Sequence, residues 1–161
     1  MGTVRRGKHA GRMWLLKVVN LYPPFLGAGI RVRRSGAAKR GFEVRMRLGA
    51  LNRNVLGTHF GGSLYAMCDP FFALILIEQL GPGYVVWDKG AVIRFVRPGR
   101  GTVRAGFEVP PESVEEIRRA ADAGAVVEPV FRVAVIDERG EVVAEVDKTL
   151  YVRRRRPESA A

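Results

Sequence analysis

The sequence has too few sulfur and imidazole side chains for several classes of small protein. It contains one cysteine and two histidines among 161 residues. A lone cysteine cannot form a disulfide within the chain, which excludes a disulfide-rich fold. Three such side chains cannot fill the four positions of a structural zinc site, so we expect no metal centre. A single cysteine suits a reducing compartment, and we expect a cytoplasmic protein.

Long uninterrupted apolar segments are also missing. Residues 13–30 are interrupted by two adjacent prolines, and residues 63–77 contain the Asp69–Pro70 pair. Both segments are too short to cross a bilayer comfortably, so no membrane span is expected. We interpret residues 12–22 as an amphipathic surface helix that the two prolines end. An interfacial helix on a membrane surface is the alternative interpretation.

Negative charge is scarce compared with positive charge. The chain has 27 Lys and Arg residues against 16 Asp and Glu residues, a net charge of +11. Such a protein attracts polyanions, including nucleic acid and the phosphates of a coenzyme. No nucleic-acid-binding motif is present, and the aromatic residues fall at core-like positions. We therefore do not expect nucleic acid as the partner.

The pattern along the chain predicts one domain. We expect residues 1–11 to be a flexible basic arm, residues 12–153 a single domain and residues 154–161 a flexible tail. Apolar residues alternate with polar ones as in half-exposed strands. The expected strands are 29–34, 42–48, 85–97, 102–109, 126–136 and 141–152.

Two internal helices are expected between these strands. Residues 63–80 are too apolar for a surface helix, and residues 110–123 form a short charged one. One apolar helix among long amphipathic strands predicts an α+β fold, with a curved antiparallel sheet wrapped around that helix and an added N-terminal helix. One sheet cannot cover all of this apolar surface, so we expect a homodimer. Pairing of dimers into tetramers is left open.

The segment LNRNVLGTHFGGSLYAMCDP carries most of the candidate site residues. Gly61 and Gly62 stand where a loop enters a helix, so their backbone N–H groups can bind a phosphate or an oxyanion. Asp69 follows two helical turns later, and a carboxylate beside an apolar pocket can act as general base or nucleophile. Two simpler interpretations stay open. The glycines can form only a tight turn, and Asp69 can cap a helix over residues 70–80.

The motif GGSLYAMCD resembles the Gly-Gly, seven-residue, Asp motif of hotdog-fold acyl-CoA thioesterases of the phenylacetic-acid-degradation type. Residues 25–153 also resemble a family of uncharacterised thioesterase-like hotdog domains. That resemblance rests on the NRN and THFGGSLYAM blocks, YVVWDK, RPGRGTVRA and GEVVAEVDKTLYVR. It implies a hotdog fold, a dimer as the smallest unit and an active site at the subunit interface.

The resemblance also implies roles for individual residues. The backbone N–H of Gly62, with Gly61 beside it, would polarise the thioester carbonyl. Asp69 would act as base or nucleophile. Asn54, or less directly Asn52, would orient water or substrate.

His59 is a further catalytic candidate, although Phe60 separates it from the glycines where the thioesterase pattern has His-Gly-Gly. Its alternative role is a hydrogen bond that orders the loop.

Cys68 lies in an apolar run and is interpreted as core. The His-Phe pair also resembles hydroxyacyl-carrier dehydratases, but those require a helical Glu where this chain has Ala73, so we exclude that activity.

The predicted reaction is hydrolysis of an acyl thioester carried by coenzyme A or an acyl carrier. No cofactor is expected beyond coenzyme A as part of the substrate. Its phosphates are expected at Arg94, Arg97 and Arg100, whose simpler interpretation is a solvated strand face. Acyl groups are expected against Tyr65, Phe71 and Phe72. The alternative function is a non-catalytic hotdog dimer that binds an acyl ligand or a polyanion.

Overall fold

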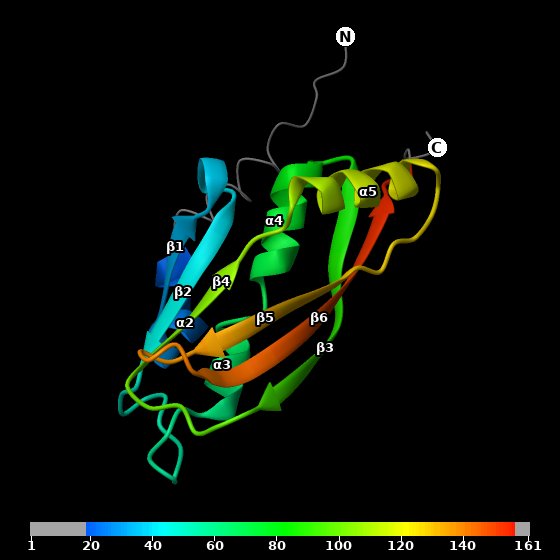
Figure 1. Cartoon of the computed structure of the whole chain (residues 1–161). Helices are drawn as coiled ribbons and strands as arrows, with labels where there is room; N and C mark the ends of the chain where they lie inside the picture. The colour runs from blue at the N-terminus through cyan, green and yellow to red at the C-terminus, as the bar shows by residue number, and fades with distance from the viewer. Residues whose placement is uncertain (1–18, 157–161) are drawn as a thin grey trace.

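The computed structural model describes residues 19–156, in which a sheet curves around helices (Figure 1). The helical elements are η1 (Val19–Leu21), α2 (Pro23–Ala28), η2 (Ala37–Lys39), α3 (Gly61–Ala66), α4 (Phe71–Leu80) and α5 (Pro111–Asp122). The strands are β1 (Ile30–Ser35), β2 (Gly41–Arg47), β3 (Tyr84–Phe95), β4 (Thr102–Phe107), β5 (Val130–Ile136) and β6 (Val142–Arg154).

The strands form one six-stranded sheet in the order β1-β2-β4-β5-β6-β3. Every neighbouring pair is antiparallel, and β1 and β3 form the two edges. The sheet bends around α4, while α5 packs across one end (Figure 1). This is the predicted architecture of a curved antiparallel sheet around an apolar helical segment.

The alternation of the sequence sets which face of each strand is buried. Ile30 pairs with Met46 and Val32 with Val44 across β1 and β2, and all four are buried. The residues between them on β1 and β2 are mostly arginines that face solvent. Strands with this period of two bury one face and expose the other, as the sequence predicts.

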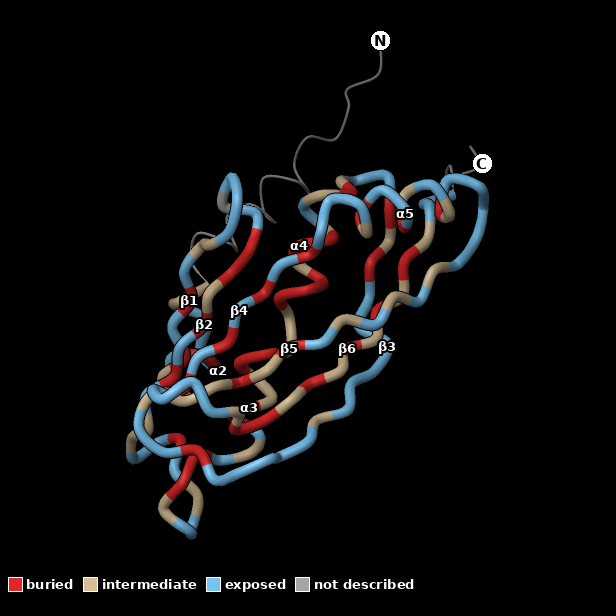
Figure 2. The backbone as a smooth tube through the Cα atoms, viewed as in Figure 1, coloured by how far each residue is buried: buried red, intermediate tan, exposed pale blue. Residues whose placement is uncertain are grey.

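Aromatic rings form the centre of the core. Phe71, at the start of α4, is fully buried, and its ring lies 5.2 Å from that of Phe42 and 4.8 Å from that of Phe107. Phe72 stacks on Phe131 at 5.0 Å. Figure 2 shows α4 largely buried beneath the sheet. The helix is apolar because it fills the concave face of the sheet.

The predicted helix over residues 63–80 is interrupted. It consists of α3 and α4, and residues 67–70 form a turn between them. Pro70 has no backbone N–H and cannot continue α3, so a new helix begins after it. By length and composition the whole segment Gly61–Leu80 could cross a membrane, but 56% of its most apolar window is buried inside this protein. Its apolar character therefore belongs to the core.

Most of the predicted helix over residues 12–22 lies outside the described residues, and a short helix follows it. Of residues 12–22 only the last four are described, and they include the short turn η1. The two prolines begin α2, because proline is tolerated in the first helical turn. Gly29 ends α2 with a φ of 70°.

The predicted flexible ends lie mostly outside the described residues. The arm over residues 1–11 is entirely outside them. The tail was expected from residue 154, but β6 includes Arg154, and the backbone N–H of Arg155 donates to Gly83 O at 2.8 Å. Arg154 is therefore part of the sheet.

Candidate active site

Asn52 holds the loop that precedes α3 in place through side-chain hydrogen bonds. Its side chain is 3% exposed, and Nδ2 donates to Ala28 O and Arg47 O, each at 2.8 Å. Its Oδ1 accepts from Gly49 N at 2.7 Å. Both amide hydrogens are therefore used in joining the loop to α2 and β2.

Asn54 orders the tip of the same loop. Its Oδ1 accepts from the backbone N–H groups of Leu56 (2.9 Å) and Thr58 (3.1 Å). Its Nδ2 donates to Thr58 Oγ1 at 2.9 Å and to His59 O at 3.3 Å. These local bonds correspond to the turn role that asparagine commonly takes.

His59 is buried between this loop and the β3–β4 connection. Its Nε2 lies 3.1 Å from Gly101 O, and its backbone N–H donates to Gly99 O at 3.0 Å. Burial lowers the pKa of His59, so the ring stays neutral and Nε2–H is the donor to Gly101. Its Nδ1 is buried without a partner among the described residues. This geometry fits the loop-ordering alternative.

Gly61 and Gly62 form the first turn of α3. Ser63 N and Leu64 N donate to Phe60 O, whereas no bond from the N–H groups of the two glycines occurs within residues 19–156. A Cβ on Gly62 would overlap the exposed ring of Phe60, and one on Gly61 would lie 2.9 Å from the ring of Phe95. Two exposed aromatic rings therefore rest on the backbone of these glycines.

Asp69 lies in the turn between α3 and α4, where four polar groups meet. Its Oδ1 accepts from Lys148 Nζ at 2.6 Å and from the Tyr65 hydroxyl at 2.7 Å. Its side chain is 43% exposed, and Oδ2 has no hydrogen-bond partner in the described part of the chain. No side chain caps α4, so the structure does not support the interpretation of Asp69 as a helix cap.

Lys148 and Asp88 complete this cluster, and sequence reasoning missed both. Lys148 is 1% exposed, and its Nζ lies 3.1 Å from Asp88 Oδ1. Burial raises the pKa of the Asp88 carboxyl, against the opposing effect of Lys148. Burial together with the bond to Asp69 raises the pKa of Tyr65, which keeps its hydroxyl protonated. The missed signal is a lysine at an inward position of an otherwise apolar strand.

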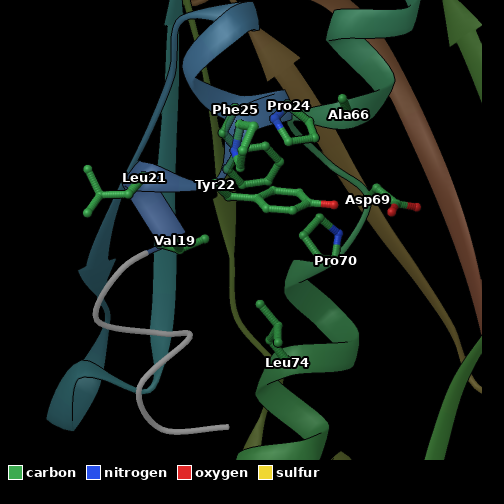
Figure 3. A pocket seen from close by; sticks show the side chains of 10 residues that line it. Val19, Leu21, Tyr22, Pro24, Phe25, Ala66, Asp69, Pro70 and Leu74 are labelled. Atoms are coloured by element: carbon green, nitrogen blue, oxygen red, sulfur yellow. The ribbon is translucent and has the colours of Figure 1, made fainter. Parts of the chain in front are cut away.

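An apolar cavity of about 650 Å³ opens beside Asp69 (Figure 3). It lies between the η1–α2 segment and the α3–α4 turn, and Figure 3 shows the Tyr22 hydroxyl pointing toward Asp69. Asp69 and Tyr22 supply the only polar side chains among its described lining. The lining residues are Val19, Leu21, Tyr22, Pro23, Pro24, Phe25, Ala66, Asp69, Pro70 and Leu74.

The residues predicted to line an acyl pocket lie elsewhere. Phe71 and Phe72 are 0% and 2% exposed and pack in the aromatic core, and Tyr65 belongs to the polar cluster. Contact of these three residues with an acyl group stays a prediction. An apolar helical residue can serve the core or a cavity, and the sequence does not distinguish the two.

The three arginines predicted to meet coenzyme phosphates already have partners. Arg94 pairs with Asp147 at 2.7 Å, and Arg97 pairs with Glu141 at 2.5 Å. Arg100 donates to a loop carbonyl at 3.4 Å. Their geometry corresponds to the solvated strand face, the simpler interpretation.

Comparison with solved structures identifies the fold. The Pseudomonas aeruginosa protein PA5026, described as of unknown function and a probable thioesterase, is 22% identical, with a TM-score of 0.75 over 96% of this chain and 100% of that one. Thioesterase HI1161 of Haemophilus influenzae is 16% identical, with a TM-score of 0.65 over 90% and 92% of the two chains. The PaaI protein of the E. coli phenylacetic acid degradation operon is also 16% identical, with a TM-score of 0.59 over 88% and 93%.

These similarities show a hotdog fold and confirm the predicted fold class. A comparison with curated protein sequences gives no match. One family profile matches residues 11–152, nearly the whole chain. The chain therefore belongs to the family described as Domain of unknown function (DUF4442).

Proposed function

We propose that this protein hydrolyses an acyl thioester and that Asp69 is its catalytic carboxylate. One observation carries the proposal: Asp69 is fixed through Oδ1 by Lys148 and Tyr65, keeps Oδ2 free and stands at the wall of an apolar cavity. A fixed carboxylate beside an apolar pocket suits proton transfer at a bound ester. The thioesterase descriptions of similar hotdog structures support the same chemistry.

In this reaction Asp69 Oδ2 accepts a proton from water as the water oxygen bonds to the carbonyl carbon. The carbon–sulfur bond then breaks, and the thiolate takes the proton back from Asp69. The free N–H of Gly62, with that of Gly61 beside it, would stabilise the carbonyl oxygen as it becomes negative. If Asp69 attacks as a nucleophile instead, the thiolate leaves and a mixed anhydride with Asp69 forms. In oxygen-18 water, hydrolysis of that anhydride at the Asp69 carbonyl leaves the label on Asp69 after a single turnover.

The cavity favours an apolar acyl group on coenzyme A or an acyl carrier. Its volume falls within the roughly 300–1,000 Å³ range of small-molecule sites. Nearly all of its lining is hydrocarbon, so each methylene placed there gains about 0.8 kcal/mol. No cofactor is part of the proposal, and we place the reaction in the cytoplasm.

A homodimer is part of the same proposal. β3 is an edge strand of 12 residues, and Trp87, Val92, Phe95 and Val96 on or next to it are each more than half exposed. A long apolar edge of this kind is a template for pairing with another chain. Phe95 also packs on Gly61, so a second subunit against β3 would lie close to the start of α3.

The test is release of free thiol from short, long and aromatic acyl-CoAs. Asp69→Asn should lose about a hundredfold or more in kcat, the size expected for loss of a general base. Asp137→Asn is the matched control, because Asp137 lies in the β5–β6 turn outside the cluster. It should retain wild-type turnover.

Two results contradict the proposal. Equal turnover by the wild type and Asp69→Asn means that Asp69 is not the catalytic group. Saturable binding of acyl-CoA by calorimetry without any turnover favours the non-catalytic acyl-binding dimer.

A further inference from the structure

Lys148 occupies a position in β6 that an apolar residue would normally fill. Its neighbours on the same face, Val146 and Leu150, are fully buried, and Lys148 itself is 1% exposed. Lysine is almost never buried to this degree without partners that balance its charge. The position therefore needs an explanation beyond packing.

The ammonium has three hydrogens, and three oxygens surround it. Asp69 Oδ1 lies at 2.6 Å, the Tyr65 hydroxyl at 3.1 Å and Asp88 Oδ1 at 3.1 Å. Burial alone would lower the pKa of Lys148, but the bonds to Asp69 and Tyr65 and the charges of Asp69 and Asp88 outweigh it, so this pKa is raised. The ammonium remains charged under any physiological condition.

The two carboxylates that share this ammonium differ in their surroundings. Asp69 also accepts from Tyr65 and lines the cavity, whereas Asp88 comes from β3 and does not line it. Asp88 stands at a register shift in the β3–β6 pairing, where the strand bulges. Lys148 therefore pairs with two carboxylates, Asp69 at the cavity and Asp88 away from it.

We propose that Lys148 is a positioning residue for Asp69 and that Asp88 is the counter-ion that stays with Lys148 throughout the reaction. The inference rests on the proposed function, in which Asp69 takes up a proton and loses its charge. A buried ammonium with a single carboxylate would then lose its only anion. With Asp88 present, the ammonium remains paired while Asp69 is neutral.

The arrangement predicts opposite effects of the two residues on the acid limb of the pH–rate profile. Lys148→Met removes a cation that lies 2.6 Å from Asp69 Oδ1, so we expect the acid limb to move to higher pH. Removing the negative charge of Asp88 should have the opposite effect and move the acid limb to lower pH. The other titratable groups nearby are Tyr65 and Cys68, whose pKa values are both raised, so neither titrates in this range. The Tyr22 hydroxyl also points toward Asp69, and burial raises the pKa of Asp88 itself.

The test uses Lys148→Met and Asp88→Asn, with Lys89→Met as the matched lysine control. The side chain of Lys89 is half exposed and pairs with Glu128 outside the cluster. Two readouts are measured for each variant: kcat/KM against pH with an acyl-CoA, and the titration of the Asp69 carboxyl carbon by carbon-13 NMR. Lys148→Met should move the midpoints of both pH curves to higher pH, and Asp88→Asn should move them to lower pH. Lys89→Met should leave both midpoints unchanged.

These readouts separate the inference from the proposed function. If Asp88→Asn and Lys148→Met turn over substrate and the midpoints of both pH curves are unchanged, the inference is overturned and the proposed function stands. Opposite NMR shifts without any turnover by the wild type support the electrostatic coupling and overturn the proposed function. If Lys148→Met does not fold, Asp88→Asn decides the matter, because the Asp88 side chain is 39% exposed and tolerates a neutral amide.

Discussion

The stability of the fold should depend on the two carboxylates that share Lys148 in a non-additive way. Asp69→Asn leaves Asp88 as the anion, and Asp88→Asn leaves Asp69. Because both carboxylates are about 40% exposed, each single change should cost only about 1 kcal/mol. The double variant leaves an ammonium that is 1% exposed with no anion at all.

The cost of the double variant can be bounded. The folded chain can always relieve the unpaired charge by deprotonating Lys148, whose ordinary pKa is 10.5. At neutral pH that deprotonation costs about 5 kcal/mol, at roughly 1.4 kcal/mol per pH unit. Removal of the partners of a buried charge commonly costs about 3–5 kcal/mol. We therefore expect the double variant to lose about 3–5 kcal/mol, clearly more than the two single changes together.

Urea denaturation of the wild type, both single variants and the double variant measures this coupling. The folded-state pKa of Lys148 in the double variant would lie below its unfolded value, so the penalty should shrink as pH rises from neutral toward about 10. Lys148→Met added to the double variant should restore most of the loss, because methionine suits the apolar site between Val146 and Leu150. Additive, pH-independent costs would refute the idea of a buried charge held by these carboxylates.

Two further predictions concern buried groups outside the cluster. Burial lowers the pKa of His59 below its ordinary 6.5, so the unfolded chain binds a proton there more readily than the folded chain does. The unfolding free energy should therefore be highest above that pH and should fall as the pH drops below it. His59→Gln should remove part of this fall when urea denaturation is compared at neutral and mildly acidic pH. Burial raises the pKa of the Cys68 thiol to about 12, so a disulfide reagent at mildly alkaline pH should modify it only after denaturant is added. Rapid modification of the native protein would contradict this.

The sheet could be predicted from the sequence because its strands bury one face only. The alternation in residues 29–34 and 42–48 places β1 and β2 within about a residue of their observed ends. β3 was also predicted, although Val92 and Phe95 in its outer half are exposed, because apolar residues occur along the whole segment. The order of the strands could not be predicted in this way, since it depends on pairing between distant segments.

Prolines were harder to interpret than apolar residues. Pro70 separates α3 from α4, where the sequence predicts one helix over residues 63–80. Pro23, which the sequence predicts to end the helix over residues 12–22, begins α2. The same missing N–H explains both outcomes, because proline is unfavourable inside a helix and acceptable in its first turn. Pro70 follows a helix that it cannot continue, whereas Pro23 follows the short turn η1 and begins a helix.

The charge balance of the candidate site is the part that sequence reasoning could not supply. The period of two in β6 assigns Lys148 to the inward face with Val146 and Leu150, and this alone implies that anions come from elsewhere in the fold. The chain has 16 acidic residues, and nothing local marks Asp69 and Asp88 among them. They lie 79 and 60 positions before Lys148 and reach it only because the α3–α4 turn and β3 both pack against β6. A charged residue at an inward strand position is therefore a reliable sign that a polar cluster exists, whereas the members of that cluster follow only from the folded chain.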